Sequence, residues 1–293
     1  MYQTAQKHYL GMVDNALEAY LSAGDMPDTL RESMRYSVFA GGKRLRPVLT
    51  LAACEMLQGD VNRAMPFACA LEMIHAYSLI HDDLPAMDND TLRRGKPTNH
   101  VVYGEGQAIL AGDGLLSYAF EIMLHACTVE NDKRFLKAAL AVAHGAGVFG
   151  MVAGQCLDLK NEGKEQVTKE TLYAIHKGKT AAMIKAAIEA GAYCAGADAQ
   201  QMDALRAFGE AYGLLFQITD DILDETGNAK SLGKSIGKDK QAGKITFVTI
   251  FGLEGAKEYA RQTAHDACKA LTMFGQDAWY FQELINKTLV REK

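Results

Sequence analysis

The stretch that decides the fold class is MDALRAFGEAYGLLFQITDDILD, residues 202–224. Its apolar residues recur at three- and four-residue spacings, which is the periodicity of a helix and not the alternation of a strand. The segments RFLKAALAVAHGAG (134–147) and ETLYAIHKGKTAAMIKAAIEAGAY (170–193) show the same pattern. All five prolines lie at or before Pro97, so the strongest helix breaker is missing from the rest of the sequence. The sequence therefore predicts an all-α protein.

The overall composition is that of an ordinary globular protein, with 293 residues of which 48% are hydrophobic and 23% charged. A formal net charge of −5 argues against a nucleic-acid-binding protein, because such proteins usually carry a basic surplus. No stretch reaches the roughly 18 uninterrupted apolar residues of a membrane span, and the start MYQTAQKHYL lacks the pattern of a secretion signal. Six scattered cysteines without a CxxC pair indicate free, mostly buried thiols. We expect one cytoplasmic domain over residues 1–293, without membrane insertion or nucleic-acid partners.

Glycine and proline positions predict where the helices of the first hundred residues begin and end. The predicted helices cover residues 2–22, a segment leading to the glycine pair 41–42, residues 47–57 and residues 65–83. We expect residues 84–100 and 160–168 to be polar loops. Thr168 suits the N-cap of the helix that follows the second loop.

Two clusters of carboxylates follow directly on apolar helical runs. They are DDLPAMDND (82–90) after LEMIHAYSLIH and DDILDE (220–225) after AYGLLFQIT. In a helix, Asp220 and Asp224 lie one turn apart on the same face, where like charges repel unless a cation lies between them. Carboxylate oxygens suit Mg²⁺, which completes its shell with water and substrate phosphate. The two clusters together predict metal ions that bridge a diphosphate between two helices.

Basic residues near the acidic clusters predict the partners of that diphosphate. Lys43 and Arg46 share a helix face just after the glycine pair, and RRGK (93–96) follows the first acidic cluster. Guanidinium groups bind phosphate oxygens bidentately. The segment ETGNAKSLGKSIGKDKQAGK (225–244), with five lysines, follows the second cluster. We interpret this segment as a mobile basic lid.

Three other kinds of site are excluded by residue type or spacing. A calcium loop of the EF-hand kind, counted from the third aspartate of the first cluster, has Arg93 and Asn99 where glycine and glutamate are required. His75 and His81 lack the four-residue spacing of a helical zinc pair. A GxGxxG match at 145–150 follows helical sequence and not a strand, so we exclude a nicotinamide cofactor and expect close helix packing there.

These motifs resemble the trans-isoprenyl diphosphate synthases, and most closely the bacterial-type farnesyl diphosphate synthases (geranyltranstransferases). The resemblance runs from about residue 41 to the C-terminus and rests on GGKRLRP, LEMIHAYSLIHDDLPAMDND, LRRGKPT, LAGDGLL, GMVAGQCLDL, IHKGKT and FQITDDILD. It implies an isoprenoid synthase fold, a bundle of roughly ten or more helices around a central cavity, and usually a homodimer. It also implies Mg²⁺ as the cofactor, at about three ions per site, with Mn²⁺ as a substitute.

The resemblance assigns roles to individual residues. The diphosphate of isopentenyl diphosphate is expected to contact Lys43, Arg46, His75 and Arg94. Metal ligands are expected at Asp82, Asp83, Asp88, Asp220, Asp221 and Asp224. The residues expected around the allylic diphosphate are Arg93, Lys179, Thr180, Gln217, Lys234 and Lys244. The residues with an expected part in catalysis are Asp82, Asp83, Asp88, Arg93, Lys179, Thr180, Asp220 and Asp221, and those that limit chain length are Tyr77 and Ser78.

The implied reaction condenses isopentenyl diphosphate with dimethylallyl or geranyl diphosphate through an allylic cation, to give farnesyl diphosphate. Tyr77, five residues before Asp82, resembles the pattern of the fifteen-carbon (C15) enzymes. In a helix Tyr77 lies about 140° around from Asp82, so its ring either lines the pocket wall or packs in the core. The alternatives are a geranylgeranyl diphosphate synthase with one more condensation, a terpene cyclase and a non-catalytic regulatory subunit. The cyclases pair a single DDxxD with a different metal motif, and intact acidic motifs argue against a regulatory subunit.

Overall fold

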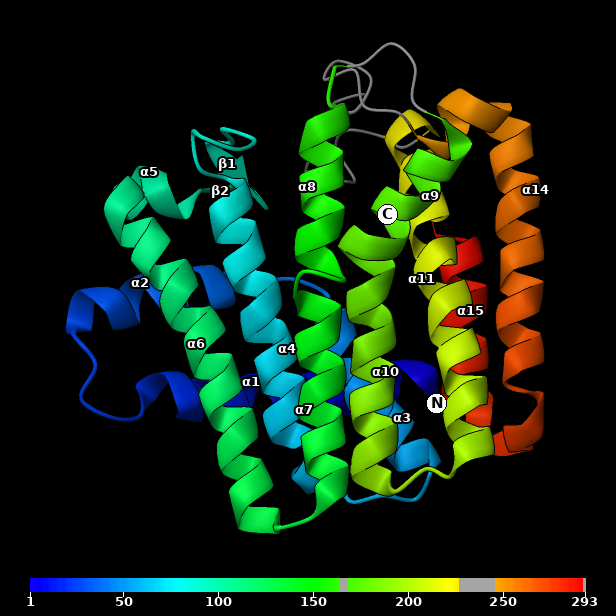
Figure 1. The fold of residues 1–293 in the computed structure, drawn as a ribbon, viewed down its shortest axis with the longest axis horizontal. Coiled ribbons are helices and arrows are strands. Elements are labelled where there is room, and N and C mark those ends of the chain that lie inside the picture. Colours follow the sequence, from blue (N-terminus) through cyan, green and yellow to red (C-terminus); the bar gives the residue numbers. More distant parts are fainter. Residues whose placement is uncertain (164–167, 227–245, 292–293) are drawn as a thin grey trace.

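Helices make up nearly all of the chain in the computed structural model, which describes residues 1–163, 168–226 and 246–291 (Figure 1). The first α-helices are α1 (Tyr2–Ser22), α2 (Asp28–Val38), α3 (Leu45–Met56), α4 (Val61–Asp82), α5 (Asn99–Tyr103), α6 (Glu105–Glu130) and α7 (Lys133–Ala146). They are followed by α8 (Met151–Asn161), α9 (Lys169–His176), α10 (Ala182–Ala195), α11 (Ala199–Thr226), α14 (Phe247–Ala270) and α15 (Trp279–Leu289). A π-helical turn, η1 (Lys177–Ala181), joins α9 to α10, and a 3-10 segment, η2 (Thr272–Ala278), precedes α15. The all-α prediction is confirmed.

Two boundaries differ from the prediction for local reasons. Helix α4 begins at Val61 and not near residue 65, because the Asp60 carboxylate accepts the backbone N–H of Asn62 at 2.9 Å and caps the helix. The helix then continues through Pro66. The predicted loop 84–100 contains a two-stranded antiparallel hairpin, β1 (Leu92–Arg93) and β2 (Lys96–Pro97). The Thr168 N-cap is confirmed, since its hydroxyl accepts the N–H of Thr171 at 3.2 Å.

The long helices α4, α7, α10 and α11 run side by side through the bundle, and α4 also packs on α6 and α11 on α14 (Figure 1). Helix α11 turns the face with Leu205, Phe208, Tyr212 and Leu215 into the core, at the three- and four-residue spacing read from the sequence. The C-terminal ends of α4 and α11 lie at the same end of the bundle, at the top of Figure 1. This arrangement brings the two aspartate clusters to one place.

Glycines let helix backbones approach closely where the sequence has its GxGxxG match. A Cβ on Gly145 of α7 would lie 2.6 Å from the Cβ of Ala186 on α10. A Cβ on Gly154 of α8 would lie 2.0 Å from the backbone nitrogen of Lys179 in η1. The interpretation as packing residues is therefore confirmed for Gly145 and Gly154.

The stretch Lys133–Asn161 is long and apolar enough to pass a composition test for a membrane-crossing helix, with a mean hydropathy of 1.6. It is weak support for a span, because residues 147–150 form a turn that divides it into α7 and α8. The absence of membrane insertion stays a prediction. All six cysteines are free, and four of them, Cys54, Cys69, Cys127 and Cys194, are buried, as expected.

Candidate active site

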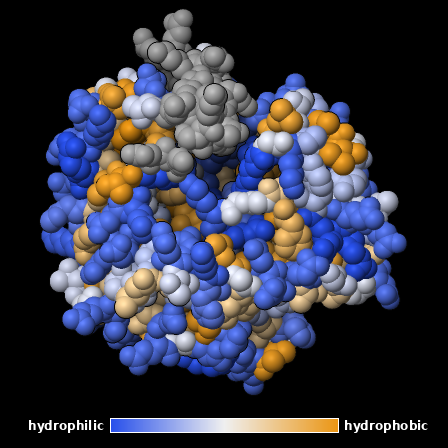
Figure 2. Space-filling model, turned by 180° about the vertical axis from the view of Figure 1, so that it is seen from behind, coloured by the Kyte–Doolittle hydropathy of each residue, from blue (hydrophilic) through white to orange (hydrophobic). Residues whose placement is uncertain are grey.

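A cavity of about 1150 Å³ lies between the C-terminal ends of α4 and α11. It opens on the face shown in Figure 2, where hydrophilic and hydrophobic residues both surround the hollow. Most of the predicted site residues line this cavity: Lys43, Arg46, His75, Tyr77, Ser78, Asp82, Arg93, Arg94, Lys179, Thr180, Gln217, Asp220, Asp221 and Asp224. Asp83 and Asp88 are not among the lining residues. Lys234, Lys244 and the predicted lid beyond Thr226 lie outside the described residues.

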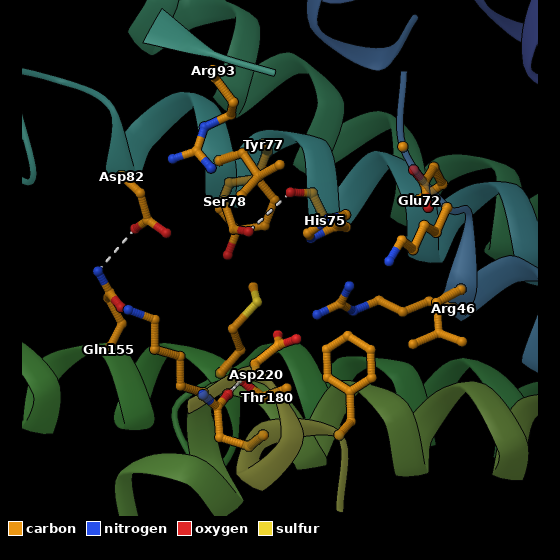
Figure 3. A pocket seen from close by; sticks show the side chains of 18 of the residues that line it. Arg46, Glu72, His75, Tyr77, Ser78, Asp82, Arg93, Gln155, Thr180 and Asp220 are labelled. Atoms are coloured by element: carbon orange, nitrogen blue, oxygen red, sulfur yellow. Dashed lines mark hydrogen bonds between the residues drawn. The ribbon is translucent and has the colours of Figure 1, made fainter. Parts of the chain in front are cut away.

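The first aspartate cluster presents one carboxylate to the cavity and uses another to hold an arginine. Asp82 faces the cavity, and one of its oxygens accepts from Gln155 Nε2 at 2.9 Å (Figure 3). Burial raises the pKa of Asp82 to about 6, against the opposing charge of Lys179. Asp83 is buried, and its carboxylate accepts from Nε and Nη2 of Arg93 at 2.8 and 2.5 Å. Arg93 therefore holds Asp83 in this structure, and the role of Asp83 as a metal ligand stays a prediction.

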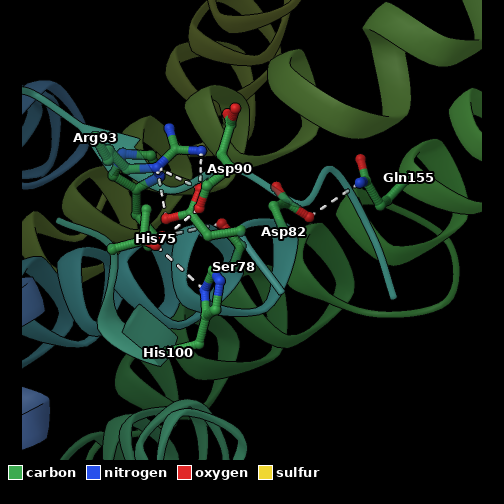
Figure 4. A network of polar contacts seen from close by, with 9 residues as sticks. His75, Ser78, Asp82, Asp90, Arg93, His100 and Gln155 are labelled. Carbon is green, nitrogen blue, oxygen red and sulfur yellow. Dashed lines mark hydrogen bonds and ion pairs between the residues drawn. The ribbon is translucent and has the colours of Figure 1, made fainter. Parts of the chain in front are cut away.

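The loop after the first cluster is fixed by its own polar contacts. The backbone N–H of Asp88 donates to the carbonyl of Asp82 at 2.8 Å, and the Asp88 side chain is exposed. Thr98 Oγ1 donates to the carbonyl of Asp90 at 2.7 Å and lies 3.2 Å from Nδ1 of His100. Figure 4 shows how this network connects the loop to the start of α5. The loop thereby presents Arg93 to the cavity.

The second cluster, on α11, is connected to three other segments. Asp220 Oδ1 lies 2.7 Å from Arg291 Nη1, just after α15. Asp221 is buried, and it accepts from Gln217 Nε2 at 3.0 Å and from the backbone N–H of Phe247 at 2.8 Å. Burial lowers the pKa of His176, 3.6 Å from Asp221, to about 4, so the imidazole is neutral at pH 7.

The π-helical turn η1 directs two neighbouring side chains into the cavity. Lys179 Nζ donates to Asp158 Oδ2 on α8 at 2.6 Å, and Thr180 Oγ1 donates to Gln217 Oε1 on α11 at 3.0 Å. A π turn adds a residue to the helical repeat and is frequent at functional sites. Here it brings a cation and a hydroxyl to the wall that carries the second cluster.

The basic wall of the cavity comes from the loop before α3, from α3 itself and from the hairpin. Lys43, Arg46 and Arg94 line the cavity together with His75, and Arg46 and His75 can be seen in Figure 3. Burial lowers the pKa of His75 well below its ordinary value, and the charges of Arg46 and Arg94 lower it further, so this ring is neutral. Arg44 has a different environment.

Arg44 is buried and is fixed by two carboxylates. Its guanidinium lies 2.8 Å from Glu72 on α4 and 3.0 Å from Asp14 on α1. Its backbone is left-handed, with φ 47°, and it directly precedes α3. Arg44 also borders the cavity, between Lys43 and Arg46, and we conclude that its two ion pairs hold this loop in place.

Four lining or supporting residues were missed by the sequence reasoning: Glu72, Gln155, Asp158 and Arg291. Gln155 and Asp158 lie in the motif GMVAGQCLDL, and Glu72 lies in LEMIHAYSLIHDDLPAMDND, but the motifs do not assign roles to these positions. Arg291 lies in no motif, and its partner Asp220 is distant in the sequence.

The carboxylates of the cavity fit divalent ions that are shared with a substrate. In the described part of the chain, no three His, Cys, Asp or Glu side chains come close enough to hold a metal by themselves. Asp82 faces the cavity from α4, and Asp220 and Asp224 face it from α11. Mg²⁺ takes one or two protein carboxylates and completes its shell with water and substrate phosphate. The donor set therefore suits ions completed by a diphosphate.

Fold and site define a class of all-α enzymes that act on diphosphates. A sequence profile described as polyprenyl synthetase matches residues 27–276, and the chain belongs to this family, whose members are trans-isoprenyl diphosphate synthases. The protein is therefore a prenyltransferase of isoprenoid synthesis, and the resemblance seen in the motifs is confirmed.

Named relatives and solved structures agree with this assignment. The large subunit 2 of a heterodimeric geranylgeranyl pyrophosphate synthase from Arabidopsis thaliana is 47% identical, over 90% of this chain and 70% of the relative. The geranylgeranyl diphosphate synthase of Cyanophora paradoxa is 46% identical, over 91% and 89%. The crystal structure of a geranyltransferase from Legionella pneumophila superposes with a TM-score of 0.89 at 35% identity, over 99% of this chain and 98% of that one. A farnesyl/geranylfarnesyl (FPP/GFPP) synthase from Zymomonas mobilis gives a TM-score of 0.86 at 34% identity, over 99% and 100%.

Proposed function

We propose that the protein elongates an allylic diphosphate with isopentenyl diphosphate, in a reaction that depends on Mg²⁺. The observation that carries the proposal is that one cavity is lined both by carboxylates from two helices and by a group of basic side chains. The carboxylates of α4 and α11 suit a metal-bound diphosphate, and the wall with Lys43, Arg46 and Arg94 suits a second diphosphate directly. A terpene cyclase acts on one diphosphate and has no use for the second site.

The residues around the carboxylates are placed to assist the departure of a diphosphate. Arg93, held by Asp83, and Lys179, held by Asp158, present positive charge to the leaving group. Mg²⁺ bound at Asp82, Asp220 and Asp224 would neutralise further negative charge on it. The oxygens of Thr180 and Gln217 lie on the same wall and would stabilise positive charge on the allylic carbon.

The basic wall would bind the second substrate, isopentenyl diphosphate. Lys43, Arg46 and Arg94 would hold the diphosphate of isopentenyl diphosphate, so that its double bond faces the allylic carbon. The neutral His75 contributes a hydrogen bond without a charge. Apolar side chains in the lining, among them Met151 and Phe216, exclude water from a cation that water would quench.

Two product lengths are supported by different observations. The names of curated relatives at 46–48% identity favour geranylgeranyl diphosphate (C20) over the farnesyl diphosphate (C15) that the motif pattern predicts. We therefore propose the C20 product as the first candidate. The C15 product is the second candidate, because Tyr77 lines the cavity with 8% of its surface exposed and its ring lies 5.7 Å from that of His81. An aromatic wall at this depth would stop a growing chain.

Supplying the primers separately distinguishes the two products. The enzyme is incubated with Mg²⁺, isopentenyl diphosphate and one of dimethylallyl, geranyl or farnesyl diphosphate, and the products are sized by chromatography. A C20 synthase consumes the farnesyl primer, whereas a C15 synthase accumulates farnesyl diphosphate and does not use it. The matched control is the Asp82→Asn/Asp220→Asn variant, which keeps the shape of both side chains. Failure to extend all three primers would contradict the proposed function.

We also propose that two copies of the chain associate through the outer face of α6 and α7. Large apolar side chains are exposed on this face, including Leu124 (52%), Val129 (69%), Leu136 (54%) and Leu140 (68%). Leu136 and Leu140 are one helical turn apart and share a face. Several large exposed apolar side chains on two neighbouring helices suit an interface. The Arabidopsis thaliana relative is named as a subunit of a heterodimer, which supports association through a related chain.

The oligomeric state tests this surface. Light scattering of the purified chain should give the mass of a dimer, and Leu136→Asp/Leu140→Asp should give a folded monomer. The control, Lys257→Asp on the exposed face of α14, should remain a dimer. A monomeric wild-type protein at micromolar concentration would contradict the homodimer.

A further inference from the structure

Helix α8 carries two polar side chains that support opposite sides of the cavity. Gln155 Nε2 donates to Asp82 Oδ1 on α4 at 2.9 Å. Asp158 Oδ2 accepts from Lys179 Nζ in η1 at 2.6 Å. Because the two residues are three positions apart, they share one face of α8. That face lies between the first aspartate cluster and the π turn.

Contact between backbones sets the distance from α8 to the π turn. A Cβ on Gly154 would lie 2.0 Å from the nitrogen of Lys179, and a Cβ on Gly178 would lie 2.8 Å from the Cα of Gly154. The two segments therefore touch without side chains between them. The backbone contact therefore fixes the position of Asp158 relative to Lys179, whereas an ion pair on a flexible surface is not fixed in this way.

In the contact between Gln155 and Asp82, only one end of the Gln155 amide has a hydrogen-bond partner among the described residues. Gln155 Oε1 is buried and has no hydrogen-bond partner among the described residues, while its amide N–H is used by Asp82. A buried acceptor without a partner is unfavourable, because it has lost its hydrogen bonds to water. The side-chain amide of Gln155 therefore donates a hydrogen bond to the Asp82 carboxylate, while its own oxygen accepts none. The contact occupies one oxygen of Asp82 and leaves the other for the cavity.

We propose that Gln155 and Asp158 are positioning residues, which hold Asp82 and Lys179 at the separation required by the metal-bound allylic diphosphate. The inference rests on the proposed function and adds to it how the two groups are fixed. Neither residue is assigned contact with the reacting atoms. Gln155 acts through Asp82, and Asp158 acts through Lys179.

A double-mutant cycle tests the first of these links. Gln155→Met keeps the length of the side chain and removes the donor, and it should lower kcat/KM for the allylic diphosphate by about 10- to 100-fold. KM for isopentenyl diphosphate should stay within about twofold of the wild type, because Gln155 does not contact the basic wall. In an Asp82→Ala background, which removes the accepting oxygen, the same change should have an effect of less than twofold.

Metal binding gives a readout where turnover is too slow to measure. Binding of Mn²⁺ in the presence of inorganic pyrophosphate, followed by electron paramagnetic resonance, should be weaker in Gln155→Met than in the wild type. It should be equally weak in Asp82→Ala with or without the second change. If Gln155→Met does not fold, Gln155→Asn retains the amide and shortens its reach, and the same comparison applies.

The second link is tested with a graded series at Asp158. Asp158→Ala should raise KM for the allylic diphosphate by about 10-fold. Asp158→Asn keeps an acceptor for Lys179 and should recover part of the loss, which a purely structural role would not require. Lys160→Ala, exposed at the end of the same helix, is the matched control and should match the wild type.

The outcomes separate this inference from the function on which it rests. If the wild type elongates primers but the Gln155 and Asp82 changes are additive in both readouts, the positioning role is wrong and the proposed function stands. An inactive wild type would remove the proposed function itself. An equal loss in Asp158→Asn and Asp158→Ala would contradict the link to Lys179.

Discussion

Arg291 Nη1 lies 2.7 Å from Asp220 Oδ1 and so connects the segment after α15 to the second aspartate cluster. The guanidinium also lies 5.4 Å from the ring centroid of Phe216, one turn earlier on α11. Both charged side chains line the cavity. A cation of the chain therefore already interacts with a carboxylate that the proposed function gives to a metal.

Replacing Arg291 should change metal and substrate affinity in opposite directions. Arg291→Met removes a positive charge beside Asp220, so the Mg²⁺ concentration for half-maximal activity should fall by about two- to fivefold, the scale of a partly exposed ion pair. KM for isopentenyl diphosphate should rise, because the cavity loses a cation. Steady-state titrations of each component measure both. Arg291→Lys, the control, keeps the charge, and both of its values should lie between those of the wild type and of Arg291→Met. A rise in the Mg²⁺ requirement of Arg291→Met would contradict the account.

Asp82 and Asp83 are adjacent, but replacing each should change a different kinetic property. Asp82→Asn should raise the Mg²⁺ requirement strongly, because Asp82 faces the cavity. Asp83→Asn weakens the hydrogen bonds to Arg93, which are worth about 1.5–3 kcal/mol for a charged group, and should mainly raise KM for the allylic diphosphate. Titrations of metal and of primer separate the two effects. Equal increases in the Mg²⁺ requirement of both variants would show that Asp83 is also a ligand.

Gly154→Ala tests the backbone contact between α8 and η1. A methyl group at this position would lie 2.0 Å from the nitrogen of Lys179, so the helices must separate. Such overpacking costs about 1–3 kcal/mol of stability, and activity should fall with it. Gly11→Ala on α1 meets no atom within 4 Å and should stabilise the helix by up to about 1 kcal/mol. Urea unfolding compares the two variants, and equal stability would contradict the close contact.

Tyr77→Ala tests which side chain limits product length. Removal of the ring deepens the cavity beneath Asp82, and the products should become longer. Tyr77→Phe keeps the ring and should give the wild-type product. Chromatography of the extracted products measures the distribution. An unchanged product in Tyr77→Ala would remove Tyr77 from this role.

The sequence predicted the parts of the site that are written as contiguous motifs. An aspartate cluster at the end of an apolar helix indicates which helix contributes to a cavity and which of its ends does so. Most of the residues assigned in this way do line the cavity. Asp83 shows the limit of this reasoning. Neighbouring residues at a helix end point in different directions, so a motif does not state which of its carboxylates is free for a ligand and which, like Asp83, binds Arg93.

Pairs between distant single residues could not be predicted in the same way. Gln155 is 73 residues from Asp82, and Arg291 is 71 residues from Asp220. Their pairing follows from how α8 and α15 pack, which local periodicity does not report. The π turn was also missed, because nothing in KGKTA distinguishes it from the helices on either side, and its close approach to Gly154 of α8 is a tertiary contact.

The most direct test of the central claim follows label from isopentenyl diphosphate into product. The enzyme is incubated with Mg²⁺, labelled isopentenyl diphosphate and unlabelled geranyl diphosphate. The account predicts a labelled prenyl diphosphate that is longer than the primer, the release of one inorganic diphosphate per condensation, and the loss of both when Mg²⁺ is chelated. Consumption of geranyl diphosphate to an unlabelled hydrocarbon or alcohol, with isopentenyl diphosphate left intact, would contradict it.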